Sequence, residues 1–234
     1  MLRQENRSLF VPRTAELTLT AGLAAIYAIT TYVPLSKFIG GPGFITLEIL
    51  MLPIIAALLR PFLALAAVFV GSLVAALGQS SFTAAFGPLG LLIPMIAVGT
   101  GSVAFHYSLG PIIPWTYVLA GAAYYIALSQ GGTLFWLLPY FLVIVSLPAI
   151  FRTRDKPRTG LLSFYTAMAE QVTLNIFSIS ILGLTGAFWL GVTPLMYAER
   201  TLATVGGATG IVALKSGLGG RLDLVEHSSK EVRY

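Results

Sequence analysis

The stretch LFWLLPYFLVIVSLPAIFRTRDKPR, residues 134–158, decides the fold of this chain. Its first part, Leu134–Phe151, carries no charge. It is long enough for a helix that crosses a hydrocarbon layer, which takes about 17 residues or more. Its second part, Arg152–Arg158, is strongly basic. Because cytoplasmic loops of membrane proteins hold an excess of Lys and Arg, the stretch predicts a membrane helix that ends at the cytoplasmic face.

The same alternation of apolar run and basic gap extends along the 234 residues. All but two of the fourteen Lys and Arg residues fall in alternate gaps, and the exceptions are Lys37 and Arg200. This asymmetry places both ends of the chain on the cytoplasmic side. We interpret eight segments as apolar spans: Leu17–Val33, Phe44–Leu59, Phe62–Leu77, Leu89–Phe105, Pro114–Leu128, Leu134–Phe151, Phe164–Leu184 and Leu195–Leu214.

We therefore predict an all-α fold, a polytopic helix bundle that crosses the cell (plasma) membrane six to eight times. Several segments are short, and the gap 106–113 has no formal charge to indicate its side, so six crossings plus a re-entrant pair is an alternative. The predicted organisation is a cytoplasmic segment over 1–16, one transmembrane domain over 17–217 and a cytoplasmic tail over 218–234.

Composition favours a bilayer as the surroundings and excludes other classes. Hydrophobic residues make up 56% of the chain and charged residues 10%, which would leave a soluble domain too little polar surface. The net charge of +5 comes from the cytoplasmic gaps, which would face anionic lipid, so no nucleic-acid partner is implied. The chain has no cysteine, which excludes disulfides and thiolate chemistry.

Small residues recur at helical spacing in the first and last segments. Membrane helices associate through close packing at such residues. In the last segment we expect the small residues to pack inside the bundle; they are Ala203, Gly206, Gly207 and Gly210. In the first segment the stripe can equally pack inside or receive the helix of a partner protein; it consists of Ala21, Ala24, Ala25 and Ala28.

Polar side chains inside the seventh and eighth segments mark a candidate site. Gln171, Asn175 and Ser178 recur at helical spacing and form one stripe. Glu199 and Arg200 are adjacent, hence about 100° apart on a helix, so each needs another partner. Burying such groups in a membrane is costly and must be offset. We predict a polar cavity that opens outward between the last two helices; the alternative is a structural network of interhelical hydrogen bonds.

Residues in the outer gaps complete the predicted site. Lys37 is the positive charge of the first outer gap, where an anionic ligand would meet it, and Gln79 begins the next one. We take both as substrate-binding residues, together with Asn175, Glu199, Arg200 and Gln171. Glu170 lies deeper, and we expect it to make a helix–helix contact. The tryptophans are expected in the interfacial belt or the core.

The chain lacks the parts of common enzymes, so we predict no enzymatic activity, no cofactor and no metal site. Only His106 and His227 are present, which is too few for a histidine metal cluster. Gly99-Thr-Gly-Ser lies within an apolar span and is not followed by the Gly-Lys pair of a phosphate loop. An intramembrane enzyme acting on lipid, with Glu170 or Glu199 as its acid or base, is a minor alternative.

Two windows resemble the substrate-binding S component of energy-coupling-factor vitamin transporters. One runs from Ala15 to Ala75, with the alanine-rich Leu19–Ala28, a glycine-rich gap before FITLEILMLP, and a Pro turn. The other has Glu170-Gln with Asn175, then Pro194, Glu199-Arg200 and a glycine-rich last helix. Together they cover about half the chain. The family has six helices, whereas eight apolar segments are present here, which would require an inserted pair within 114–151.

The resemblance implies a function and partners. The protein would capture a small vitamin-like solute from outside and topple to deliver it inward. The alanine pairs Ala21/Ala25 and Ala24/Ala28 would dock on a membrane-embedded coupling subunit driven by two cytoplasmic ATPases. The ligand would sit in the outer half against the last helices. The alternative is a non-catalytic structural or assembly subunit of another membrane complex.

Overall fold

The fold is all-α, with one small β-hairpin. The structure, a computed structural model, describes residues 14–38, 44–77, 83–129 and 134–218. Its elements in chain order are α1 (Thr14–Thr30), β1 (Pro34–Lys37), β2 (Phe44–Thr46), η1 (Leu47–Leu50), α2 (Met51–Leu58), α3 (Pro61–Leu77), α4 (Thr83–Phe86), η2 (Gly87–Leu91), α5 (Leu92–His106), α6 (Ile112–Leu128), η3 (Leu134–Leu137), α7 (Leu138–Arg152), α8 (Asp155–Ser180) and α9 (Phe188–Leu218).

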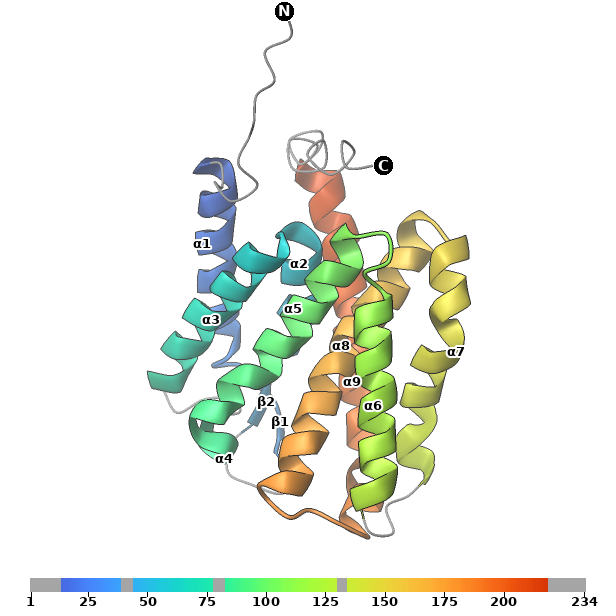
Figure 1. Cartoon of the computed structure of the whole chain (residues 1–234). Coiled ribbons are helices and arrows are strands. Elements are labelled where there is room, and N and C mark those ends of the chain that lie inside the picture. The colour runs from blue at the N-terminus through green and yellow to red at the C-terminus, as the bar shows by residue number, and fades with distance from the viewer. Residues whose placement is uncertain (1–13, 39–43, 78–82, 130–133, 219–234) are drawn as a thin grey trace, which may run out of the picture.

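The long helices stand side by side and alternate in direction (Figure 1). The start of α1, the α2–α3 turn, the α7–α8 turn and the end of α9 lie at one end of the bundle, which we name the basic end. The β1–β2 hairpin and α4 lie toward the other end, named the hairpin end. The described basic residues of the alternate gaps therefore lie at this one end, as the charge pattern predicts. Examples are Arg60, Arg154 and Lys215.

Helix α8 is the centre of the bundle, because α2, α5, α6, α7 and α9 all contact it. Glycines on two of these neighbours allow the close approach. A Cβ added at Gly101 of α5 would overlap Thr166, and one at Gly121 of α6 would overlap Val172. The consequence is a core helix with nearly every residue from Leu162 to Asn175 buried, including several polar ones.

The small residues of α9 pack inside the bundle, as the sequence predicts. A Cβ added at Gly206 would stand 2.6 Å from Cδ2 of Leu50, and one at Gly207 would stand 2.8 Å from Cγ of Pro53. Both distances are too short for real carbon contacts. The missing side chains therefore let α9 lie directly against η1 and α2.

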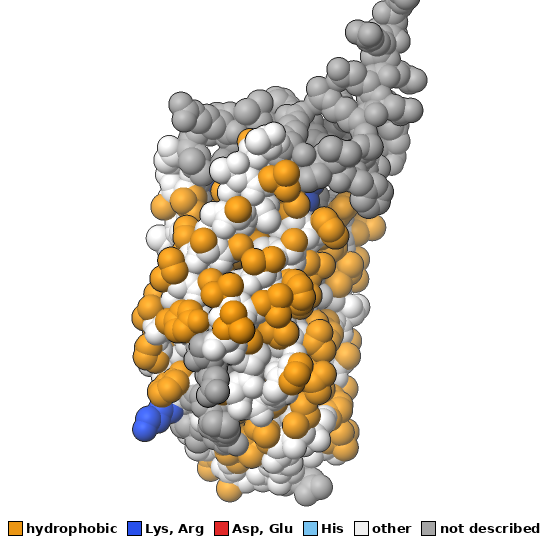
Figure 2. All heavy atoms as spheres, turned by 90° about the vertical axis from the view of Figure 1, so that its left-hand side faces the viewer, with side chains coloured by type: hydrophobic (Ala, Val, Ile, Leu, Met, Phe, Trp, Pro, Cys, Tyr) orange, Lys and Arg blue, Asp and Glu red, His pale blue; other side chains and the backbone are white. Residues whose placement is uncertain are grey.

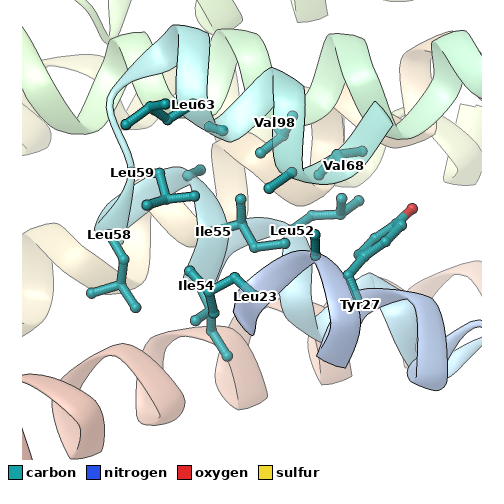
Figure 3. Close-up of a cluster of buried hydrophobic side chains, with 14 of the residues drawn as sticks. Leu23, Tyr27, Leu52, Ile54, Ile55, Leu58, Leu59, Leu63, Val68 and Val98 are labelled. Carbon is teal, nitrogen blue, oxygen red and sulfur yellow. The ribbon is translucent and has the colours of Figure 1, made fainter. Parts of the chain in front are cut away.

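An apolar cluster fills the space between α1, α2, α3 and α5, and we name it the aliphatic cluster (Figure 3). Its centre is fully enclosed, since Leu52, Ile55 and Val68 are 0% exposed. On α3, a Cβ at Gly71 would stand 2.9 Å from the carbonyl oxygen of Ala24, so α1 and α3 meet almost backbone to backbone.

The β-hairpin corrects part of the sequence interpretation. The segment Phe44–Leu59 was expected to be one helix, but Phe44–Thr46 is a strand that pairs antiparallel with Pro34–Lys37. Ile45 and Thr46 are β-branched and suit a strand. A short apolar run of this kind cannot be assigned to strand or helix from periodicity alone. Helix α8 also begins earlier than expected, at Asp155 instead of Phe164.

Length and composition support fewer membrane spans than the eight apolar segments. Among the described helices, those long and apolar enough to cross a membrane are Thr83–His106 and Leu134–Arg152. Four others are apolar but shorter: Thr14–Thr30, Leu47–Leu58, Pro61–Leu77 and Ile112–Leu128. The expectation of six to eight crossings therefore stays a prediction.

The outer surface of the bundle is rich in large apolar side chains. The face in Figure 2 is covered with hydrophobic side chains over most of its height, and Lys and Arg are visible only toward its ends. Leu77 is 87% exposed, Phe62 is 77% exposed and Ile126 is 65% exposed. Such contiguous apolar surface marks contact with a membrane or with another protein.

Candidate functional site

A cavity lies at the hairpin end, where the hairpin meets α8, α9 and η3. We name it the hairpin cavity. It contains about 400 Å³ of space free of atoms, counted with its open mouth. Its walls are formed by Lys37, Phe38, Ile45, Trp136, Gln171, Leu174, Asn175, Ser178, Phe188, Trp189, Val192, Leu195, Met196 and Glu199. The mixture of aromatic and polar walls is typical of small-molecule sites.

Helix α8 supplies the amide-bearing wall. Gln171, Leu174, Asn175 and Ser178 follow at intervals of three, one and three residues, which places them on one helix face. The orientation of the Asn175 amide is assigned from its neighbours. With its oxygen toward the aromatic side chains, it accepts from Nε1 of Trp136 at 2.7 Å and from the hydroxyl of Tyr140. Asn175 is thereby held rigidly between α7, η3 and α8.

Helix α9 supplies an aromatic and acidic wall. Trp189, Val192, Met196 and Glu199 again follow at helical spacing, so one face of α9 lines the cavity. The rings of Trp136 and Trp189 have centroids 4.9 Å apart at an angle of 60°, the edge-to-face arrangement that aromatic pairs favour. These two indoles are the largest apolar side chains of the wall.

Glu199 joins the hairpin to α9. The hydroxyl of Ser36 donates a hydrogen bond of 2.5 Å to Oε1 of Glu199. The carboxylate is 6% exposed, whereas Lys37, the neighbour of Ser36, is exposed. The cavity therefore has a negative group within its wall and a positive group at its rim.

Arg200 is not part of the cavity wall. It is 1% exposed and faces α8, where Nη1 donates to Oε2 of Glu170 at 2.5 Å and to the carbonyl oxygen of Ala167 at 3.0 Å. Its Nη2 lies 4.0 Å from Oε2 of Glu199. The expectation that Glu199 and Arg200 need separate partners agrees with this geometry. The cavity is therefore bordered by Glu199, with Arg200 in the layer behind it.

Several buried polar atoms around the cavity have no hydrogen-bond partner among the described residues. One belongs to a residue of its wall, Nε1 of Trp189. Others lie behind it, such as Oε1 of Glu170 and Nε of Arg200. An unsatisfied buried polar atom costs about 1–3 kcal/mol. Such atoms in the wall of a cavity are available to a ligand.

The remaining predicted site residues have different positions. Gln79 lies outside the described residues. On α1, Ala24 and Ala28 are buried against the bundle, whereas Ala21 and Ala25 are exposed. The alanine stripe therefore divides into an inner pair, which packs near Gly71, and an outer pair on the surface.

Sequence reasoning did not select the aromatic residues of the wall. Trp136 and Trp189 were expected to be belt or core residues. A usable signal was present on α9, because Trp189 lies ten residues before Glu199, at a helical interval that also includes Val192 and Met196. For Trp136 the position in η3 gave no such signal.

Acidic and histidine side chains do not gather into a metal site within the described residues. The chain matches no family model, no curated protein and no solved structure. The resemblance to S components therefore rests on the quoted residues alone.

Proposed function

We propose that this protein is a membrane subunit that binds a small vitamin-like solute at its outer side and delivers it inward with an ATPase-driven coupling module. The single observation that carries the proposal is the hairpin cavity. Its lining residues belong to the hairpin end of the bundle, and the charge pattern predicts that this end lies outside. Polar residues of its wall, Gln171 and Asn175, come from one face of the central helix.

Membrane insertion is part of this proposal. It is supported by exposed apolar side chains on the bundle surface and by charges at its ends. The short helices remain compatible with crossing if the bilayer thins locally or flanking residues reach to its surface. The expected arrangement is six to eight crossings with both chain ends inside.

The absence of cysteine allows a direct test of orientation. Single cysteines at Leu35 and Ser216, both exposed, would report the hairpin end and the basic end. In intact cells, a membrane-impermeant maleimide should label Leu35→Cys, whereas Ser216→Cys should react only after permeabilisation. Labelling of Ser216→Cys in intact cells contradicts the proposed orientation.

The outer pair on α1 supports the docking of a partner. Ala21 and Ala25 are exposed, and no atom lies within 4 Å of a Cβ added at Gly22 between them. This strip of small residues suits close approach of another membrane helix. The variant Ala25→Leu should keep ligand binding by the purified protein and lose ligand uptake by cells.

The decisive experiment is ligand identification. Native mass spectrometry of protein purified in detergent should detect a co-purified small molecule, and calorimetry should reproduce its binding. The same measurement on Asn175→Leu should show the loss of that molecule. A wild-type protein without a co-purified ligand, and without binding across a panel of vitamins, contradicts the proposal.

A second candidate function is a non-catalytic assembly subunit of another membrane complex. It is favoured by the partners that Asn175 and Arg200 already have inside the bundle. Under this function the polar residues serve stability alone, and α1 docks a permanent partner. It predicts no ligand and a large loss of stability in Asn175→Leu.

A further inference from the structure

The hairpin cavity has a carboxylate in its wall whose ion pair with the nearest cation is long. Glu199 is 6% exposed, and the guanidinium nearest to it already pairs with Glu170 at 2.5 Å, leaving 4.0 Å to Glu199. Lys37 is exposed to solvent, and in the described part of the chain no ion pair joins it to Glu199. Glu199 is therefore open to a positively charged partner.

The charges buried in the interior also favour a bound cation. Among the described residues, the buried charged side chains are Glu48, Glu170, Glu199 and Arg200. Beside the cavity, two of these carboxylates, Glu170 and Glu199, share the one guanidinium. A buried charge without a partner is costly, so a bound cation would relieve this imbalance and a bound anion would increase it.

The remaining walls suit a flat ring. Trp136, Trp189 and Phe188 line the cavity, and the first two are each 2% exposed. The faces of indole rings attract organic cations. Nε1 of Trp189 has no hydrogen-bond partner among the described residues, so a donor is present for the edge of such a ring.

We infer that the ligand of the hairpin cavity is a small, flat organic cation, held by the indoles of Trp136 and Trp189 with its positive charge beside Glu199. The inference rests on the proposed binding function and specifies its substrate class. Lys37, at the rim, disfavours the cation slightly through repulsion that solvent screens.

The first test is the charge of the co-purified molecule. Native mass spectrometry followed by fragmentation should identify an aromatic compound with a permanent or protonated positive charge. A tightly bound neutral or anionic molecule would overturn this inference and leave the proposed function intact. A protein without any ligand would overturn both.

The second test compares three rings of nearly the same shape: 1-methylnicotinamide (cation), nicotinamide (neutral) and nicotinate (anion). The chain has three tryptophans, and two of them line the cavity, so Trp115→Phe leaves only reporters in the site. In this background, quenching of tryptophan fluorescence should show that the cation binds at least 10-fold more tightly than nicotinamide, with nicotinate weakest. Equal affinities, tighter binding of nicotinate, or no quenching by any of the three would overturn the inference.

Substitutions then locate the charge that is recognised. Glu199→Gln should remove the 10-fold preference for the cation. Its amide oxygen can still accept from Ser36, so the hairpin contact is kept. Glu16→Gln is the matched control, because Glu16 pairs with Arg60 outside the cavity and its loss should leave the preference unchanged. Lys37→Gln should keep or slightly raise cation affinity; a 10-fold loss there would contradict the inference.

Discussion

The aliphatic cluster and the hairpin cavity are built on opposite principles. In the aliphatic cluster, side chains such as Leu52, Ile55 and Val68 are fully enclosed and need no polar partner. Around the hairpin cavity, Trp189 and Glu170 are buried, and each has a polar atom left unmatched among the described residues. The aliphatic cluster contains only the apolar side chains that close packing needs. The surroundings of the hairpin cavity retain polar groups that apolar side chains could replace, which is expected where a site serves binding.

The largest effect is expected from breaking the buried ion pair. Arg200→Met would leave Glu170 charged and enclosed, and should lower the free energy of unfolding by about 3–5 kcal/mol. Arg60→Met is the control, because its pair with Glu16 involves an arginine side chain that is 32% exposed, and such pairs contribute about 1 kcal/mol or less. Chemical unfolding in detergent micelles measures both. Equal losses of unfolding free energy would mean that the buried Arg200–Glu170 pair stabilises the protein no more than the Arg60–Glu16 pair does.

In the aliphatic cluster we expect a loss of stability without a change in ligand affinity. Leu52→Ala removes a fully buried side chain and should cost about 2–5 kcal/mol, because a cavity remains. At a temperature where the variant is folded, its ligand affinity should equal that of the wild type. Calorimetry with the co-purified ligand checks this. A 10-fold change in affinity would show that the two regions are coupled.

Close packing between α1 and α3 can be tested with two glycines. In Gly71→Ala the new Cβ would overlap Tyr27 and the backbone of Ala24, and the expected cost is about 1–3 kcal/mol. In Gly22→Ala the new methyl has open space, and the better helix propensity should stabilise the protein by up to about 1 kcal/mol. Unfolding of the two variants under one condition should give shifts of opposite sign.

The smallest effect on stability, and the sharpest on function, is expected at Gln171. Gln171→Leu removes the side-chain hydrogen bond between the Gln171 and Asn175 amides, which are 2.7 Å apart, so stability should fall by about 0.5–1.5 kcal/mol. Ligand affinity should fall at least 10-fold, because a polar contact in the wall is lost. A stable variant with unchanged affinity would place Gln171 among purely structural residues.

Most helices of the bundle could be predicted from the sequence, because each apolar run has about the same extent as one helix. The predicted spans overlap α1, α2, α3, α5, α6, α7, α8 and α9, whereas the short α4 lies in a predicted gap. The hairpin was not predicted, because a three-residue strand such as Phe44–Thr46 is set by its pairing with β1, which local patterns do not contain. The start of α8 at Asp155 was missed because its first turns are polar.

The candidate site was predicted where helical spacing carries the information. Gln171 and Asn175 lie four residues apart on the cavity-facing side of α8. Glu199 lies on the cavity-facing side of α9. The burial of Arg200 was not predictable in this way, since it depends on Glu170 thirty positions earlier in the chain. Trp136 was missed because a tryptophan near a helix end fits a belt, a core and a binding site equally well.

The hydrogen bond from Ser36 to Glu199 joins residues 163 positions apart. Ribosomes add about 5–20 residues per second, so the hairpin waits roughly 8–33 s for the helix that accepts its bond. Until then the cavity lacks one side. Completion of the cavity is therefore among the last events of biogenesis.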